Sequence, residues 1–165
     1  MLTEFLVEDH RRLDGLLQTA VAHPVAVDDR DYAQFRAGLL RHIGMEEKIL
    51  LPAVQRRRGG EPLPLAAKLR LDHGALASLL MPTPTAAILA TIRGILVSHN
   101  LLEEGAAGLY ETCAALAGSE GEPILAALRA APEVTVMPYN DSPAVMNAVR
   151  CALERAGYHL RDQYS

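Results

Sequence analysis

Apolar residues recur every three or four positions from residue 3 to residue 117, which is the spacing of one face of an α-helix. This pattern predicts four helices, at about residues 3–22, 29–57, 64–80 and 85–117. Segments rich in proline and glycine, which disfavour helix interiors, separate them: His23-Pro24, Gly59-Gly60-Glu61-Pro62 and Pro82-Thr83-Pro84. Four helices with short connections favour an all-α fold, an antiparallel up-down four-helix bundle.

The character of the chain changes after Gly118. Residues 119–165 carry four of the ten prolines and one further amphipathic segment, for which Ser142-Pro143 is a suitable cap and first position. We therefore divide the chain into a bundle, residues 1–118, and a C-terminal extension, residues 119–165. The extension is expected to contain a further short helix and to pack on the bundle. Its only histidine is His159.

Histidine and carboxylate side chains interrupt the apolar stripes at matching offsets in two parts of the chain. The first copy of the pattern is Asp9-His10-x-x-Leu13 followed by His42-x-x-x-Glu46-Glu47. The second copy is Asp72-His73-x-x-Leu76 followed by His99-x-x-x-Glu103-Glu104. Residues four apart lie one turn apart on the same helix face, so each His-x-x-x-Glu pair points into the same interior. Imidazole and carboxylate together suit iron, zinc or manganese.

The polar residues on the apolar stripes have an alternative interpretation as ordinary core residues. The carboxylates argue against it. A single buried histidine is most often a hydrogen-bonded core residue. Burying an unpaired carboxylate, however, costs several kcal/mol even after relaxation. By chance, 20 acidic residues among 165 put one four positions after a given histidine about once in eight times. Its double occurrence predicts a two-metal site whose ligands are His10, His42, Glu46, His73, His99 and Glu103.

The order of the ligands points away from ferritin-like carboxylate sites, whose Glu-x-x-His pattern does not occur in this sequence. Residues 5–115 instead resemble the hemerythrin-like, or HHE cation-binding, domain. The segment from His42 to Glu47, with the trailing Pro52, is similar to that family's signature, and the segment from His99 to Glu104 is similar to its second copy. The resemblance implies a four-helix bundle around a non-haem di-iron centre.

The resemblance also implies a role for each ligand. Glu46 and Glu103 would bridge the two ions, and the four histidines would be terminal ligands. The implied cofactor is two iron ions, joined also by an oxo or hydroxo bridge, with zinc or manganese as possible substitutes. Oxygen-carrying members have a fifth histidine four residues from the one on the third helix. Here those positions are Leu69 and Ala77, which cannot bind a metal.

The missing fifth histidine changes the expected function. Two octahedral ions have about twelve ligand positions. Four histidines, two bridging carboxylates and one oxygen bridge fill all but two. The resemblance therefore implies a protein that binds or senses oxygen or another diatomic, or handles iron, with reversible oxygen carriage in doubt. The alternatives are a di-metal oxidase or peroxidase and a regulatory module with a structural metal site. No covalent catalytic residue is predicted.

Five residues near the ligands have two interpretations each. Glu47 and Glu104 are turned about 100° from the bridging glutamates, which favours solvated or interhelix charges over extra ligands. Asp9 and Asp72 adjoin ligand histidines. Neighbouring positions on a helix do not face each other, so surface roles are favoured over support of a ligand. Tyr110, seven residues after Glu103, is interpreted as a core residue with a satisfied hydroxyl, the alternative being a hydrogen bond to a bound ligand.

Composition limits the partners. The formal net charge is −4, and the one basic run, Arg56-Arg57-Arg58, is interpreted as the solvated end of a helix, so no nucleic-acid partner is expected. No stretch reaches the length of a membrane span and no signal peptide is recognised. Cys113 and Cys151 are expected to be buried free thiols, which favours a cytoplasmic location. The expected partners are metal ions and a diatomic ligand, and the oligomeric state stays open.

Overall fold

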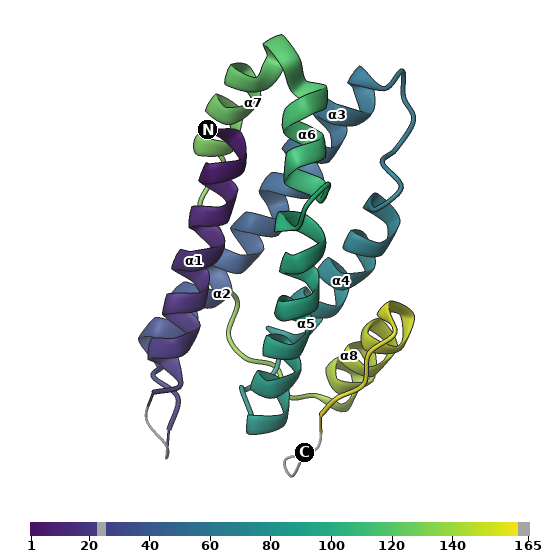
Figure 1. The fold of residues 1–165 in the computed structure, drawn as a ribbon. Helices are drawn as coiled ribbons and strands as arrows, with labels where there is room; N and C mark the ends of the chain where they lie inside the picture. The colour runs from purple at the N-terminus through teal and green to yellow at the C-terminus, as the bar shows by residue number, and fades with distance from the viewer. Residues whose placement is uncertain (23–25, 162–165) are drawn as a thin grey trace. The chain divides into compact units, whose positions relative to one another are not determined.

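The computed structural model describes residues 1–22 and 26–161, and every regular element in them is a helix (Figure 1). The all-α expectation is therefore confirmed, whereas the up-down order of a four-helix bundle stays a prediction. The break at His23-Pro24 lies outside the described residues. The elements are α1 Leu2–Ala20, α2 Asp29–Met45, η1 Glu46–Leu50, α3 Leu51–Arg57, α4 Ala66–Leu79, α5 Ala86–Glu104, α6 Leu109–Ala117, η2 Gly118–Glu120, α7 Gly121–Arg129 and α8 Pro143–Ala156.

Two compact units make up the chain, and each is described by itself. The first unit comprises Met1–Pro64 and Leu102–Val136, and the second comprises Leu65–Leu101 and Met137–Ser165. The boundary between Leu101 and Leu102 falls within α5. The predicted division of the chain at residue 118 stays a prediction.

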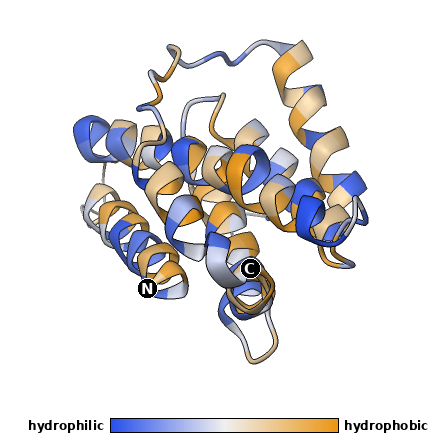
Figure 2. Cartoon of the chain, turned by 90° about the horizontal axis from the view of Figure 1, so that it is seen from above, coloured by the Kyte–Doolittle hydropathy of each residue, from blue (hydrophilic) through white to orange (hydrophobic). Residues whose placement is uncertain are grey.

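In the first unit, α1 packs against α2, α6 and α7. The stripe predicted for α1 is buried as expected, and Figure 2 shows hydrophobic and hydrophilic residues on different sides of the helix that begins at the N-terminus. Each buried leucine of this stripe contributes about 1.5–3 kcal/mol through removal of apolar surface from water. The stripe thus fixes the face of α1 that carries His10. It consists of Leu6, His10, Leu13, Leu17 and Ala20.

The predicted second helix runs without interruption from Asp29 to Arg57, but its winding widens at η1. The N–H of Leu51 donates to the carbonyl of Glu46, five residues earlier, as in a π-helix. Pro52 follows directly. Its ring lacks an N–H and would clash with a carbonyl four residues earlier, so a wider turn accommodates it. The extra residue shifts the buried stripe. Leu50 is fully buried, whereas Ile49, which a regular helix would place on the stripe of His42 and Glu46, is only half-buried.

The predicted fourth helix is not continuous, and the expectation of one helix over residues 85–117 was wrong. α5 ends at Glu104 and α6 begins at Leu109. Ala107 between them has a φ of 57°. A Cβ on Gly108 would lie 2.7–2.8 Å from three backbone carbonyl oxygens, so only glycine fits there. Ala106, predicted to point inward, is exposed because the helix has already ended, whereas Tyr110 and Cys113 are buried on α6.

In the second unit, α8 packs along α4 and buries Val149 and Leu153. The predicted start of α8 is confirmed, because the Ser142 hydroxyl accepts a hydrogen bond from the N–H of Val145 and Pro143 is the first helical residue. α7, which lies in the first unit, is a helix that the sequence pattern did not predict.

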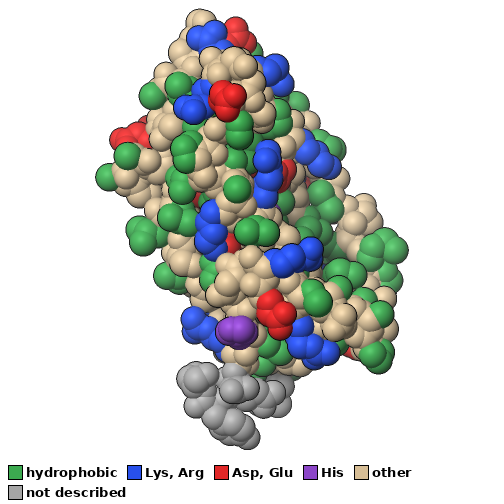
Figure 3. Space-filling model, turned by 90° about the vertical axis from the view of Figure 1, so that its right-hand side faces the viewer, with side chains coloured by type: hydrophobic (Ala, Val, Ile, Leu, Met, Phe, Trp, Pro, Cys, Tyr) green, Lys and Arg blue, Asp and Glu red, His purple; other side chains and the backbone are tan. Residues whose placement is uncertain are grey.

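The surface and the long apolar segment bear on the expected partners. Side chains of both charges are interspersed with apolar ones on the face seen in Figure 3. The basic run at the end of α3, Arg56 to Arg58, is exposed, as expected. Between Ala86 and Arg129, a window of 18 residues with mean hydropathy 1.2 is long and apolar enough to cross a membrane. The expectation that no stretch reaches this length was therefore wrong. The finding is weak support for a span, because a core helix of a soluble protein meets the same test.

The two cysteines differ in exposure. Both are free thiols, but only Cys113 is buried, and Cys151 on α8 is exposed. The expectation of two buried thiols is therefore wrong for Cys151, which lies on the outward face of an amphipathic helix.

Candidate metal centre

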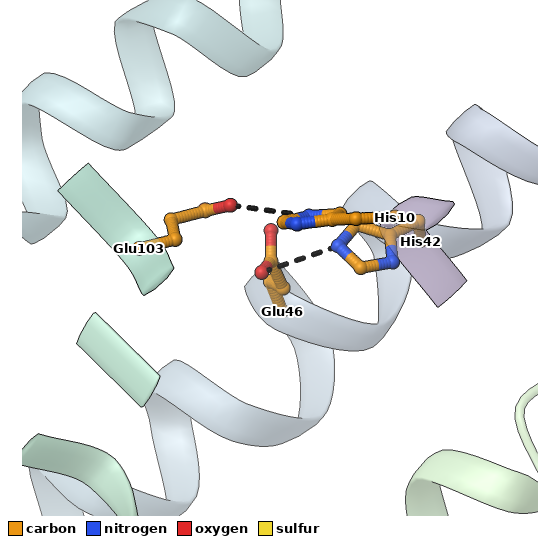
Figure 4. A group of neighbouring side chains, drawn as sticks. All are labelled: His10, His42, Glu46 and Glu103. Atoms are coloured by element: carbon orange, nitrogen blue, oxygen red, sulfur yellow. Dashed lines mark ion pairs between the residues drawn. The ribbon is translucent and has the colours of Figure 1, made fainter. Parts of the chain in front are cut away.

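Four of the six predicted ligands meet inside the first unit, and we call them the four-residue cluster: His10, His42, Glu46 and Glu103. They come from α1, α2, η1 and the end of α5, and Figure 4 shows the side chains converging. Their exposed fractions are 7%, 2%, 0% and 0%. One nitrogen or oxygen atom from each residue lies within 4.8 Å of the others, an arrangement that could hold a metal ion.

Each histidine of the cluster is paired with a carboxylate of the cluster. His10 Nε2 lies 3.3 Å from Glu103 Oε2, and His42 Nε2 lies 3.4 Å from Glu46 Oε1 (Figure 4). Burial lowers the pKa of His42, but Glu46 and Asp9 outweigh burial and raise that pKa to about 10. The buried carboxylates therefore require positive charge beside them, which protons or a metal ion can supply.

The outer nitrogen of each ring in the cluster is held by a further carboxylate. His42 Nδ1 lies 2.8 Å from Asp9 Oδ2, and His10 Nδ1 lies 2.5 Å from Glu104 Oε1. With Nδ1 donating its hydrogen outward, Nε2 is left to face the cluster. Carboxylate–histidine pairs of this kind fix the tautomer and orientation of metal ligands.

Asp9 is itself held by a cation. Arg12 donates from Nε to Asp9 Oδ1 over 2.8 Å, and its Nη2 lies 2.7 Å from the same oxygen. Burial raises the pKa of Asp9, but the hydrogen bonds from His42 and Arg12 outweigh burial and lower it. Asp9 therefore stays ionised at neutral pH and able to hold the ring of His42.

The second unit repeats this arrangement around the other two predicted ligands. His99 Nδ1 lies 3.3 Å from Asp72 Oδ2, and Lys68 Nζ donates to Asp72 Oδ1 over 2.5 Å. His73 Nε2 and His99 Nε2 lie 3.2 Å apart and are buried. Two nitrogens bound to one ion at about 2.1 Å, at an angle near 100°, would be about 3.2 Å apart. The pair therefore fits a shared metal ion.

The surface role favoured for Asp9 and Asp72 was wrong. Both are buried, and each holds a histidine of another helix instead of the histidine beside it in sequence. The repeated Asp-His dipeptide was the available signal. For Glu104, the interhelix interpretation is confirmed by its contact with His10. Glu47 is half-buried.

Tyr110 is a core residue with a satisfied hydroxyl, as expected, but the partners of that hydroxyl are the cluster atoms. Its oxygen lies 2.6 Å from Glu46 Oε1, 2.9 Å from His10 Nε2, 3.1 Å from His42 Nε2 and 3.1 Å from Glu103 Oε2. Burial, and then the two carboxylates, raise the pKa of Tyr110 well above its usual value. Without an ion the phenol is therefore protonated and donates to Glu46.

Replacing Asp9 with asparagine is expected to weaken metal binding about 10–100-fold, the usual cost of losing a partner that orients a ligand histidine. The side chain keeps its size but loses the charge that holds His42. Affinity is measured by competition with a chelator. Asp14→Asn, an exposed change on the same helix, is the matched control and should leave the affinity unchanged. An Asp9→Asn affinity within twofold of the parent would contradict the orienting role.

The donor chemistry fits a metal centre, since imidazole nitrogens and carboxylate oxygens converge in a buried place. The four-residue cluster and the His73–His99 pair together account for every predicted ligand. Their union into one di-metal centre stays a prediction. Comparison of the chain with protein-family models, with curated proteins and with solved structures finds no match.

Proposed function

We propose that this chain is a non-haem di-iron protein of the hemerythrin-like type, which binds or senses oxygen or another diatomic. One observation carries the proposal. In three of the four candidate histidines, Nδ1 contacts a carboxylate and Nε2 faces another candidate ligand. The three are His10, His42 and His99. A histidine that only fills a core needs no such support, whereas a metal ligand does.

In this proposal the iron would be held by six residues, Glu46, Glu103, His10, His42, His73 and His99. Bound iron would supply a redox-active Lewis acid that can take a diatomic. The chain itself orients the imidazoles through Asp9, Glu104 and Asp72, and offsets the charge of the ions with the carboxylates.

The apolar residues around the cluster support a small ligand. Leu6 and Leu13 lie one turn to either side of His10, and Leu39 precedes His42 by three residues; all three are buried. Such a lining excludes water and suits a diatomic better than a polar organic substrate. At the position that would carry a fifth histidine, Leu69 is fully buried, which weighs against reversible oxygen carriage. An oxidase or peroxidase and a regulatory module would use the same ligands and stay alternatives.

We also propose a cytoplasmic location, supported by the two free thiols, Cys113 and Cys151. Metal ions and a diatomic are the proposed partners. No nucleic-acid partner is proposed, because the formal net charge is −4.

Anaerobic reconstitution with Fe(II) is expected to give two iron ions per chain by elemental analysis. Admission of air should change the optical spectrum, and degassing should not restore it, because the fifth histidine is missing. His159→Ala, a change at an exposed histidine, is the control and should bind the same amount of iron. One iron or none per chain in the parent protein would contradict the di-iron proposal. A spectrum that reverts fully over repeated cycles would contradict the expected irreversibility.

A further inference from the structure

The hydroxyl of Tyr110 has more polar contacts than a tyrosine in a protein core needs. Its hydroxyl oxygen is within 3.1 Å of one donor atom from every member of the four-residue cluster. A phenol that only fills the core is satisfied by one or two partners. An ion taken up by these four donors would have to bind in the space that surrounds this oxygen.

The break between α5 and α6 is what brings the hydroxyl there. In an uninterrupted helix, a residue seven positions after Glu103 would lie about 10 Å further along the axis. Instead, α5 ends at Glu104, and the chain turns through Ala107 and Gly108 before α6 begins. The hydroxyl of Tyr110 on α6 then contacts Glu103. The backbone at Gly108 admits no Cβ, so the turn depends on this glycine.

The repeated motif gives Tyr110 no counterpart. The residue seven positions after Glu103 is Tyr110, whereas the residue seven positions after Glu46 is Ala53. The two halves of the ligand pattern otherwise match. The tyrosine therefore belongs to one copy of the repeat only, the copy that contains Glu103.

We infer that Tyr110 is a further metal ligand, which binds through its phenolate oxygen to the ion held by His10 and His42. This inference rests on the proposed function. On metal binding, the phenolic O–H bond breaks, the proton leaves to solvent, and the oxygen forms a bond to the ion. The ion held by His73 and His99 would gain no such ligand, so the two ions would be inequivalent, and of the two open positions one would remain, at the second ion.

The test is the spectrum of the protein loaded with ferric citrate, because phenolate bound to Fe(III) gives a charge-transfer absorption in the visible range. The full-length protein should show this absorption, with resonance Raman bands that shift when the tyrosine rings are deuterated. Tyr110→Phe should lose the absorption and still bind iron, with an affinity lower by at least about tenfold. Tyr32→Phe, which also removes a buried phenol from the first unit, should keep the absorption.

The outcomes separate the two proposals. If the parent protein binds iron without the absorption, or Tyr110→Phe keeps it, the ligand role of Tyr110 is overturned while the proposed function stands. If the parent protein binds no iron, the proposed function itself fails. Should Tyr110→Phe not fold, the deuterium shift in the parent protein decides, since it requires no variant.

Discussion

Replacing Glu46 with alanine is expected to remove at least one iron ion per chain. Glu46 is fully buried and contacts both His42 and Tyr110, so its loss takes away a bridge and leaves the remaining cation under-compensated. A ligand present at a thousand times its Kd stabilises the folded protein by about 4 kcal/mol. For a chain of this size each kcal/mol shifts the Tm by about 2–4 °C. The variant should therefore lose about 8–16 °C of the stabilisation that iron gives.

Elemental analysis and thermal unfolding with and without iron check this prediction. Glu8→Ala, an exposed glutamate on α1, is the control and should keep both the iron content and the iron-dependent rise in Tm. A Glu46→Ala protein with two iron ions per chain would show that Glu46 is not a ligand.

The release of the His42 proton is expected to raise the apparent affinity for iron about tenfold for each pH unit between pH 6 and pH 9, and a proton released by Tyr110 would add to this slope. Burial lowers the pKa of His42, but Glu46 and Asp9 outweigh burial and raise it to about 10. His42 therefore carries a proton in the metal-free protein through this range. Binding through Nε2 requires neutral imidazole, so each ion that binds there must release that proton. Across three pH units the change amounts to about a thousandfold.

The effect of pH on the stability of the metal-free fold has the opposite sign. Because the pKa of His42 is raised on folding, its contribution to the stability of the metal-free protein is complete below about pH 6.5 and is lost as the pH rises to about 10. Alkaline conditions therefore weaken the metal-free fold while they favour the iron-loaded one. Titration calorimetry in two buffers of different ionisation enthalpy counts the released protons. An affinity that does not change with pH, with no proton released, would rule out His42 as a ligand.

The sequence by itself determined most of the helices and the candidate ligands, because both depend on short-range spacing. The burial of Leu6, His10, Leu13 and Leu17 on α1 follows from a period of 3.6 residues. The pairing of His42 with Glu46 follows from one helical turn. Capping of α8 by Ser142 is equally local. Such features need no knowledge of how distant segments meet.

Local irregularities were harder to predict. The π turn at Glu46–Leu50 and the break before α6 both depend on single residues, Pro52 and Gly108, whose effect on a helix varies with its surroundings. A proline can kink a helix, end it or be absorbed by a wider turn, and periodicity alone does not distinguish these outcomes. The break places Tyr110 among the cluster atoms, which a continuous helix would not do.

Only the tertiary structure decided which groups support the ligands. Asp9 meets His42 across 33 residues, Glu104 meets His10 across 94, and Tyr110 meets His10 across 100. Seen along one helix, Asp9 and Glu104 point away from the ligand beside them, which is why Asp9 was assigned to the surface and Glu104 only to a solvated or interhelix charge. Their true partners lie on neighbouring helices. A carboxylate hydrogen bond depends on the position of its acceptor to within a few tenths of an ångström, and packing between helices sets that position.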